Sequence, residues 1–370
     1  MSKTAYIAER IFTGEKFIGG HAVIVDGGIV ESVIPTGTLP SDINTRQLPH
    51  QTLAPAFMDL QIYGGDEGMF SLFPSVESLQ ATHRYCVRGG ATHFMATVAT
   101  NDPEITYQAI SAAREYWAQG LPGLLGLHLE GPYLNPEKKG AHLTRYIKRP
   151  VLQEVKDLLS VGEGMIRMMT VAPECCDDEV IRYLMEHGVV VSAGHSNATY
   201  DQAMDAFHLG IPTATHLYNA MSPLQHRAPG MVGAIFDGDV FCSIVADGIH
   251  VDFAAVRIAK KIMGNRLFLI TDAVTEAQTD SYTYIMENNR YVTENGTLAG
   301  SCLTMGRAVK NLIIEMGIDP AEALPMASLY PARVIGRDNS LGRIAPGYEV
   351  DWVVLDQEYD VQGTITGEVK

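Results

Sequence analysis

Eight short apolar runs, separated by loops and helical stretches, fill most of the chain from about residue 53 onward. They are Leu53–Gln61, Thr92–Val98, Leu124–Glu130, Ile166–Val171, Val189–Gly194, Thr213–His216, Cys242–Ala246 and Leu267–Thr271. Most are apolar enough to be strands that are covered on both faces, as in a parallel sheet. Strands that alternate with helices are typical of βα units, and eight such units close a barrel. We therefore predict an α/β fold with a (β/α)8 TIM-like barrel over residues 53–339.

Both ends of the chain have the pattern of strands joined by tight turns. Residues 4–52 contain β-like runs such as Ala22–Val25 and turn signals such as Asp26–Gly28, which predict a meander of hairpins. After a helical stretch near Leu303–Met316, the tail turns into the β-like run Asp351–Leu355. We expect residues 1–52 and 340–370 to form one small, discontinuous β-sandwich domain.

Charge and composition exclude several classes of function. With 43 acidic and 27 basic side chains the formal net charge is −16, so no basic stripe is available for nucleic acid or for an anionic membrane surface. No stretch of eighteen apolar residues predicts a membrane span, and no apolar segment follows the N-terminus as in a signal peptide. The five cysteines lack C-x-x-C spacing, so we expect buried thiols and a cytoplasmic location.

Four side chains that bind metals or transfer protons stand at the ends of predicted strands: Glu130, His195, His216 and Asp272. The carboxyl ends of barrel strands surround one mouth, where residues distant in sequence converge. Glu130, His195 and His216 offer one oxygen and two nitrogens, enough to hold zinc with a position left for water or substrate. A single histidine at a strand end is more often a hydrogen-bonded core residue, but three candidate ligands in this order predict a metal site.

Asp272 follows an apolar strand, which would deliver its carboxylate into the same mouth. Its predicted role is to accept a proton from attacking water and then to protonate the departing amine. The alternative is that Asp272 caps the N-terminus of a helix.

Several longer motifs appear in combination along almost the whole chain. They are His128–Tyr133 followed by Lys139–His142, Ala193–Ser196, Thr215–Met221, Asp247–His250, Thr271–Ala273 and Ala299–Met305. In these motifs the chain resembles the N-acetylglucosamine-6-phosphate deacetylases of the amidohydrolase superfamily. The resemblance implies metal-dependent hydrolysis of the N-acetyl group of N-acetyl-D-glucosamine 6-phosphate to D-glucosamine 6-phosphate and acetate. It places such an enzyme in amino-sugar catabolism or cell-wall sugar recycling.

The resemblance also assigns residues. It implies Glu130, His195 and His216 as metal ligands and Asp272 as the catalytic carboxylate. For the sugar phosphate it implies His142, Asn219, Ala220, Arg227, His250, Leu303, Thr304 and Met305. The planar Arg227 guanidinium can pair with phosphate through two hydrogen bonds, and in this family such an arginine can come from the neighbouring subunit of a homodimer. Which of His142 and His250 polarises the acetyl carbonyl stays open here.

One departure from the superfamily pattern concerns the number of metal ions. Many amidohydrolases carry H-x-H at the end of the first barrel strand, whereas this chain has Gln61-Ile62-Tyr63. Neutral glutamine is a poorer ligand than imidazole for zinc, so Gln61 marks a vestigial second site and we expect one divalent ion per subunit. Zinc is the default, and iron, cobalt and manganese are the alternatives.

Two other functions stay open: hydrolysis of a different amide, and a sugar-phosphate sensor without catalysis.

Overall fold

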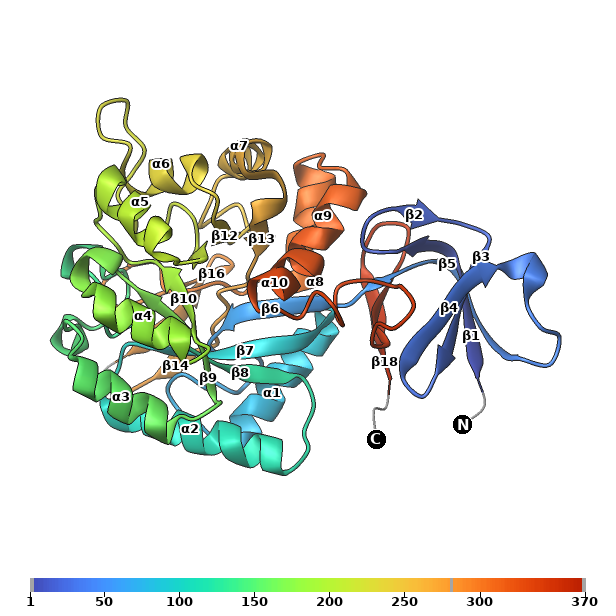
Figure 1. Cartoon of the computed structure of the whole chain (residues 1–370), viewed down its shortest axis with the longest axis horizontal. Coiled ribbons are helices and arrows are strands. Elements are labelled where there is room, and N and C mark those ends of the chain that lie inside the picture. Colours follow the sequence, from blue (N-terminus) through green and yellow to red (C-terminus); the bar gives the residue numbers. More distant parts are fainter. Residues whose placement is uncertain (1–2, 280–281, 368–370) are drawn as a thin grey trace. The chain divides into compact units, whose positions relative to one another are not determined.

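The computed structural model describes residues 3–279 and 282–367 of the chain (Figure 1). The fold divides into two compact units. One consists of Met1–Met58, Cys86–Thr92 and Thr304–Lys370, and the other of Asp59–Tyr85 and His93–Leu303. None of the helices within the described ranges combines the length and the apolar character that crossing a membrane requires.

The unit that contains the termini is built on a seven-stranded sheet with the order β18-β17-β5-β1-β3-β4, in which β2 pairs with β1. Its strands are β1 (Thr4–Phe12), β2 (Phe17–Ile18), β3 (His21–Asp26), β4 (Ile29–Pro35), β5 (Asn44–Pro55), β17 (Asp351–Leu355) and β18 (Val361–Thr366). Strands from both ends of the chain therefore share one sheet, which confirms the predicted small β-domain. Its main core surrounds the buried Trp352, whose ring meets Tyr6 edge to face at 5.2 Å.

The predicted meander of hairpins is correct for β3 and β4, which pair antiparallel across Asp26–Gly28. It is wrong for β5, which lies parallel to β1. The connection from β4 to β5 contains the short helix η1 (Thr36–Thr38). It is long enough to cross over to β1, so that β5 can run parallel to that strand. A hairpin pattern therefore does not reveal this crossover.

The same unit contains α8 (Met305–Lys310), the π-helix η6 (Asn311–Glu315), α9 (Pro320–Ala327) and α10 (Leu329–Val334). The predicted helical stretch at Leu303–Met316 is confirmed, with a later start because the Thr304 side chain caps α8 by accepting from the Arg307 amide. The domain limits at 52/53 and 339/340 stay a prediction, since the compact unit includes residues 304–339 as well as the strands of both termini.

Eight parallel strands form the barrel in the order β6 to β13. They are β6 (Phe57–Ile62), β7 (Ala91–Ala99), β8 (Leu124–Glu130), β9 (Ile166–Val171), β10 (Val190–Ala193), β11 (Thr213–Ala214), β12 (Phe241–Ile244) and β13 (Leu267–Leu269). The segment after β13 returns to β6: the Tyr63 amide donates to Ala273 O at 2.9 Å, and the Asp272 amide donates to Gln61 O at 3.0 Å. These bonds close the barrel and confirm the predicted fold class.

All eight predicted runs contain a barrel strand, but the first run is divided. Leu53–Pro55 belongs to β5 and pairs with β17, so β6 begins only at Phe57. Apolar character cannot separate the two strands here, because the end of β5 at Leu53–Pro55 is as buried as β6. Five free cysteines are present, and the expected burial is correct for Cys86 and Cys242 and wrong for the exposed Cys302.

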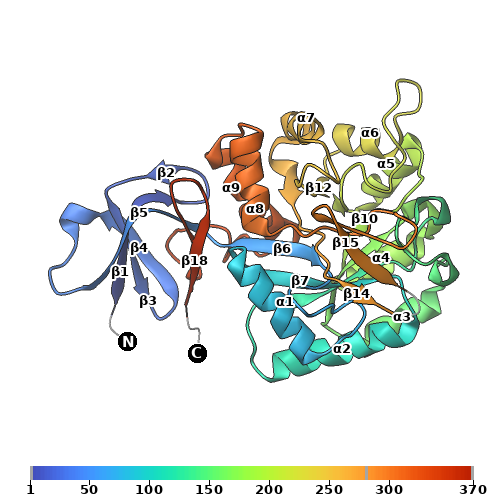
Figure 2. The same ribbon diagram turned by 180° about the vertical axis from the view of Figure 1, so that it is seen from behind.

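Helices connect the barrel strands and lie on their outer side (Figure 2). They are α1 (Val76–Arg88), α2 (Pro103–Ala118), α3 (Leu152–Val161), α4 (Asp178–Glu186), α5 (Tyr200–Leu209), α6 (Gly230–Asp237) and α7 (Phe253–Met263). Short 3-10 turns also occur, at η2 (Pro136–Lys138), η3 (Thr144–Tyr146), η4 (Pro173–Cys175) and η5 (Gly264–Arg266). After β13, a small antiparallel sheet of β14 (Ala277–Gln278), β15 (Thr283–Glu287) and β16 (Arg290–Val292) is added. Loops at the carboxyl ends of the barrel strands are thus left free to carry a site.

Candidate active site

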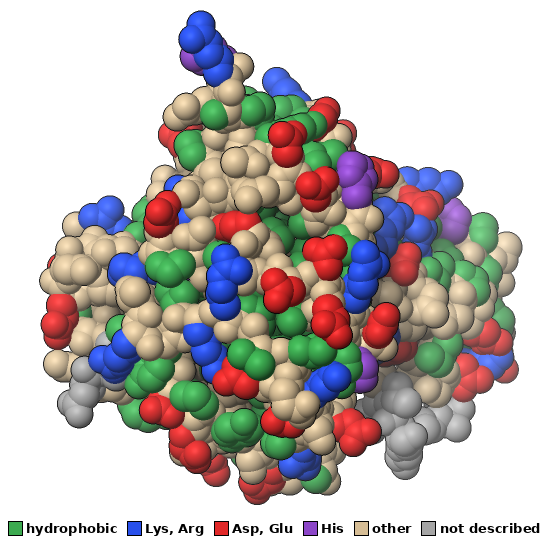
Figure 3. Space-filling model, turned by 60° about the vertical axis from the view of Figure 1, so that its left-hand side comes forward, with side chains coloured by type: hydrophobic (Ala, Val, Ile, Leu, Met, Phe, Trp, Pro, Cys, Tyr) green, Lys and Arg blue, Asp and Glu red, His purple; other side chains and the backbone are tan. Residues whose placement is uncertain are grey.

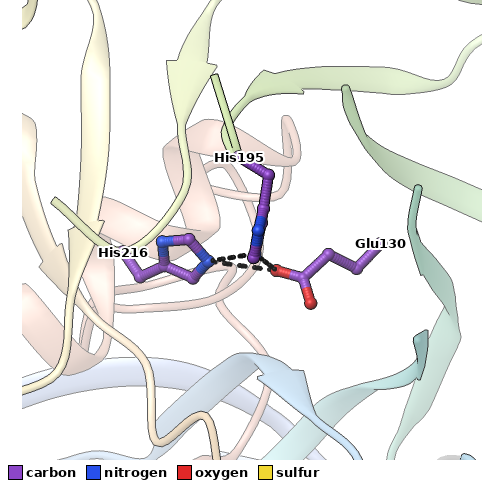
Figure 4. A group of neighbouring side chains, drawn as sticks. All are labelled: Glu130, His195 and His216. Carbon is purple, nitrogen blue, oxygen red and sulfur yellow. Dashed lines mark hydrogen bonds and ion pairs between the residues drawn. The ribbon is translucent and has the colours of Figure 1, made fainter. Parts of the chain in front are cut away.

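Three side chains carried by strands β8, β10 and β11 point toward one another at the mouth of the barrel (Figure 4). Glu130 ends β8, while His195 and His216 each follow the last residue of their strands, β10 and β11, by two positions. Glu130 Oε1 lies 3.1 Å from His216 Nε2 and 3.3 Å from His195 Nε2, and the two imidazole nitrogens are 3.1 Å apart. All three residues are buried. The structure thus brings together the three predicted ligands.

The hydrogen bonds around this cluster prepare it for a cation. His195 Nδ1 donates to the Lys138 carbonyl at 2.8 Å, which leaves the lone pair of His195 Nε2 directed at the centre. That nitrogen faces His216 Nε2 and a carboxylate oxygen, so two imidazoles and an anion converge on one point. A divalent ion would satisfy all three atoms at once, and the donor set suits zinc. The residues therefore fit a metal site.

The backbone at this mouth is held in an unusual conformation. His195, His216 and Asp272 have φ values of 47°, 40° and 54°, and Tyr218 and Ala220 also lie in the left-handed region. Residues other than glycine adopt this conformation at a cost, and such strain concentrates at functional sites. Surrounding hydrogen bonds fix it: the Asp272 amide donates to Gln61 O, and the His216 amide to Ser243 Oγ at 2.8 Å.

The Glu130 carboxylate is surrounded by donors. Its Oε2 accepts from the Tyr63 hydroxyl and lies 2.9 Å from His142 Nε2. Because His142 Nδ1 accepts from the Thr100 amide at 3.2 Å, the proton of a neutral His142 is on Nε2 and is donated to Glu130. Burial opposes ionisation of Glu130, but the imidazole of His142, which donates to the carboxylate, helps to outweigh it and to hold its pKa well below the ordinary range. Glu130 is therefore an anion that is ready to bind a cation.

Removal of one of these donors should weaken the folded protein. Burial and the adjacent Glu130 raise the pKa of Tyr63, so its hydroxyl keeps its proton and donates. A hydrogen bond to a charged group contributes about 1.5–3 kcal/mol, and we expect Tyr63→Phe to lower the free energy of unfolding of the metal-free protein by that amount. Denaturant titration beside the exposed control Tyr107→Phe tests this expectation. Equal stability of Tyr63→Phe and the parent would show that the bond contributes nothing.

Asp272 lies in the same cluster. Its Oδ1 accepts from Gln61 Nε2 at 2.8 Å, and the same amide lies 3.0 Å from Glu130 Oε1. Burial raises the pKa of Asp272, although the neighbouring His216 opposes this shift. The segment after Asp272 pairs with Ile62 and Ser301 through isolated bridges instead of starting a helix, so the helix-cap alternative is wrong.

A cavity of about 160 Å³ opens directly onto this cluster. Of the predicted residues, Glu130, His195, His216, Asp272, His142, Asn219, Ala220 and His250 line it. His250 Nδ1 lies 2.6 Å from Asp247 Oδ2 and donates to it, whereas its buried Nε2 has no partner among the residues that the structure describes. An imidazole nitrogen without a partner at a cavity wall is available to a ligand.

The cavity wall also includes residues to which the sequence patterns assigned no individual role in the site. They are Tyr63, Ala99, Gly140, Ala141, Val274, Tyr282, Tyr284, Leu298, Ala299 and Gly300. The rings of Tyr282 and Tyr284 stack with their centroids 5.8 Å apart. Their two-residue spacing is the only sequence signal that places both on one face of a strand. His128 is instead occupied inside the barrel, where its ring nitrogens bond Leu60 O and Thr170 Oγ1.

Four of the predicted substrate residues do not line this cavity. Leu303 is buried, and Thr304 and Met305 belong to the start of α8 in the other compact unit. Arg227 lies in the exposed segment 223–228, where an isolated bridge between Gln225 and Ala228 forms a narrow hairpin. This hairpin projects beyond α5 and α6 (Figure 1), and a projection that ends in basic and imidazole side chains is visible in Figure 3.

Comparison with known proteins agrees with this geometry. Residues 52–368 match the profile described as the amidohydrolase family, and residues 5–52 match the NagA composite domain. The N-acetylglucosamine-6-phosphate deacetylase of Haemophilus influenzae is 39% identical over 98% of both chains. The N-acetylgalactosamine-6-phosphate deacetylase of Escherichia coli O157:H7 is 33% identical over 96% of both. The crystal structure of the N-acetylglucosamine-6-phosphate deacetylase from Pasteurella multocida superposes with a TM-score of 0.95 over 99% of both chains at 35% identity.

Proposed function

Because the chain belongs to the amidohydrolase family, we propose that it hydrolyses the N-acetyl group of N-acetyl-D-glucosamine 6-phosphate to D-glucosamine 6-phosphate and acetate. The observation that carries this proposal is the buried Glu130, His195 and His216 cluster beside Asp272 in one cavity. The names of the relatives indicate the substrate, and the residues of the cavity are of the types that hydrolyse an amide.

Asp272 is the residue that moves protons in this proposal. Its carboxylate removes a proton from water as the water oxygen bonds to the acetyl carbon. The same proton then passes to the nitrogen as the C–N bond breaks, which releases acetate and the free amine. Glu130, His195 and His216 would hold a divalent ion, which would supply Lewis-acid polarisation of the acetyl carbonyl. The hydrogen bond from Gln61 keeps the Asp272 carboxylate directed toward the cavity.

We propose one divalent ion per subunit, with zinc as the default and iron, cobalt or manganese as alternatives. Gln61 and Tyr63 occupy the positions of the superfamily's H-x-H pair, and both donate hydrogen bonds to Glu130. These donors lie where a second ion would need ligands. Metal analysis of the purified protein should therefore give one equivalent per chain.

The two candidate histidines differ in their availability. Both ring nitrogens of His142 already have partners, Thr100 and Glu130, whereas His250 Nε2 has none within residues 3–279 and 282–367. We assign His250 to a polar group of the sugar phosphate and His142 to the support of Glu130. Asn219 and the Ala220 backbone complete this wall, and Leu303, Thr304 and Met305 stay proposed substrate residues on the family resemblance.

Arg227 is proposed to bind the phosphate of the substrate held by the neighbouring subunit of a homodimer. Its exposed hairpin and its separation from the cavity residues support a role in trans. Arg227→Ala should raise KM for the phosphorylated sugar by about tenfold or more, since one charged hydrogen bond contributes about 1.5–3 kcal/mol, and should leave kcat unchanged. Steady-state kinetics beside Arg257→Ala, on α7, measure this effect. An unchanged KM would remove Arg227 from the phosphate site.

Subunit mixing separates a role in trans from a role in cis. Arg227→Ala and Asp272→Asn protomers are mixed, allowed to exchange, and assayed at a substrate concentration below KM. If Arg227 serves its neighbour, a mixed dimer contains one complete site, and the activity exceeds the sum of the separate variants. An activity no greater than that sum would place Arg227 in its own subunit or outside the site.

Acetate release tests the proposed function directly. The protein is assayed with N-acetylglucosamine 6-phosphate and with unphosphorylated N-acetylglucosamine, before and after chelation and after metal is restored. We expect metal-dependent release that strongly favours the phosphorylated sugar. No release from either sugar by metallated protein would point to another amide substrate, and tight binding of the sugar phosphate without release would point to a sensor.

N-acetylgalactosamine 6-phosphate is a second candidate substrate, because the Escherichia coli O157:H7 relative carries that name. The two sugars differ in the configuration of one hydroxyl group. The ratio of their kcat/KM values in the same assay assigns the preference.

Five free cysteines suit a reducing compartment, and we propose a cytoplasmic enzyme of amino-sugar catabolism or cell-wall sugar recycling.

A further inference from the structure

Glu174 lies outside the cavity, in the short helix η4 directly after β9, yet it contacts both segments that hold His195. We propose that Glu174 is the positioning residue of the metal centre: its carboxylate bridges the turn behind the His195 ring to the loop after His195. This inference rests on the metal site of the proposed function, although it does not depend on the identity of the substrate.

The first part of the argument is the turn at residues 135–138. The Asn135 amide donates to the His195 carbonyl at 3.0 Å, and His195 Nδ1 donates to the Lys138 carbonyl at 2.8 Å. One turn therefore fixes both the backbone and the ring of His195. Asn135 itself forms this turn, since its Oδ1 accepts from the Glu137 amide at 2.9 Å and its carbonyl accepts from the Lys138 amide.

The second part is the position of the Glu174 carboxylate. Its Oε1 accepts from Asn135 Nδ2 at 2.9 Å and from the Asn197 amide at 2.7 Å. Its Oε2 accepts from Ser196 Oγ at 2.7 Å. The Glu174 carboxylate therefore connects the 135–138 turn to Ser196 and Asn197, the two residues that follow His195. Charged hydrogen bonds of this length are about twice as strong as neutral ones.

The backbone of His195 explains why such a tie is needed. With a φ of 47° the residue is in the left-handed region, which costs free energy unless the surroundings fix it. Release of the 135–138 turn or of Ser196 would let the ring rotate, and Nε2 would no longer face Glu130 and His216. Glu174 thus acts on the metal through His195 and touches no substrate atom.

Zinc affinity tests this proposal without any substrate. Metal-free parent, Glu174→Gln and Glu174→Ala proteins are titrated with zinc in competition with a chromophoric chelator. Partners that orient a metal-binding histidine typically contribute about 10–100-fold to affinity or activity, so we expect Glu174→Ala to raise the zinc Kd by that factor. Glu174→Gln keeps the shape and one acceptor oxygen, and it should lie between Glu174→Ala and the parent. Glu179→Gln on the exposed side of α4 is the matched control.

The unfolding of the metal-free proteins separates positioning from a structural role. If Glu174 positions His195, the zinc Kd rises in the order parent, Glu174→Gln, Glu174→Ala, while kcat falls with little change in KM. An unchanged zinc Kd would overturn the proposal, even if the metal-free Glu174→Ala protein unfolded at a lower temperature. A raised Kd in a protein that releases no acetate would keep this inference and remove the proposed substrate instead.

Discussion

Asp272→Asn is expected to lower turnover by at least about a hundredfold, the lower end of what a positioned acid or base contributes. Asparagine keeps the shape of the side chain and an acceptor for Gln61 Nε2, but it can neither accept the proton from water nor deliver it to the amine. The effect should appear in kcat, because the lost interaction belongs to the transition state. Initial rates of acetate release at saturating substrate measure it.

Metal content distinguishes a catalytic Asp272 from a structural one. The Asp272→Asn protein should bind the same single equivalent of metal as the parent, because Glu130, His195 and His216 are unchanged. Asp205→Asn, on the exposed face of α5, is the control and should match the parent in rate and in metal content. Turnover near that of the parent would remove Asp272 from the catalytic role.

Glu130→Gln is expected to weaken zinc binding by more than about a hundredfold, beyond the usual effect of an outer partner, because it removes the only anion of the proposed ligand set. The neutral amide cannot compensate the charge of the ion, and its NH2 group would face donors at Tyr63 and His142. Turnover should fall with metal content. Competition with a chelator measures the affinity, and metal analysis after dialysis measures the content.

The control for this variant is Glu186→Gln, an exposed residue at the end of α4. Circular dichroism of both proteins without metal shows whether the fold is retained. If Glu130→Gln is folded and binds zinc as tightly as the parent, the metal is not held at this cluster. In that case the roles of His195 and His216 would have to be reassigned as well.

The sequence predicts the barrel well because the strands repeat one pattern eight times, and each misplaced boundary has a separate cause. Leu53–Pro55 and β6 form one apolar run in sequence, and the pairing of Leu53–Pro55 with β17 and β1 separates them. The parallel position of β5 beside β1 depends on a crossover that local turn signals do not encode. Secondary structure is a local property, whereas strand pairing depends on tertiary contacts.

The cluster of Glu130, His195, His216 and Asp272 was predictable because parallel strands end at one mouth, so their last residues must meet. The supporting residues were not predictable in the same way. Tyr284 reaches the cavity from β15 of the added sheet and Tyr282 from the position just before it. Glu174 contacts Asn135, Ser196 and Asn197 from a loop, and these contacts depend on the tertiary fold. Arg227 carries the right chemistry in the sequence, but its proposed role requires a partner subunit.

The contact that closes the barrel, between β6 and the segment after β13, has a consequence for how the site is assembled. Gln61 and Asp272 meet there through both backbone and side chain, although 211 positions separate them in the chain. Contacts of such long range form late, because a large loop must close before they stabilise the chain. A ribosome must therefore have synthesised nearly three quarters of the protein before Asp272 can reach its partners. Until that contact forms, the proposed catalytic carboxylate is separated from the proposed metal ligands, and the growing chain contains no complete site.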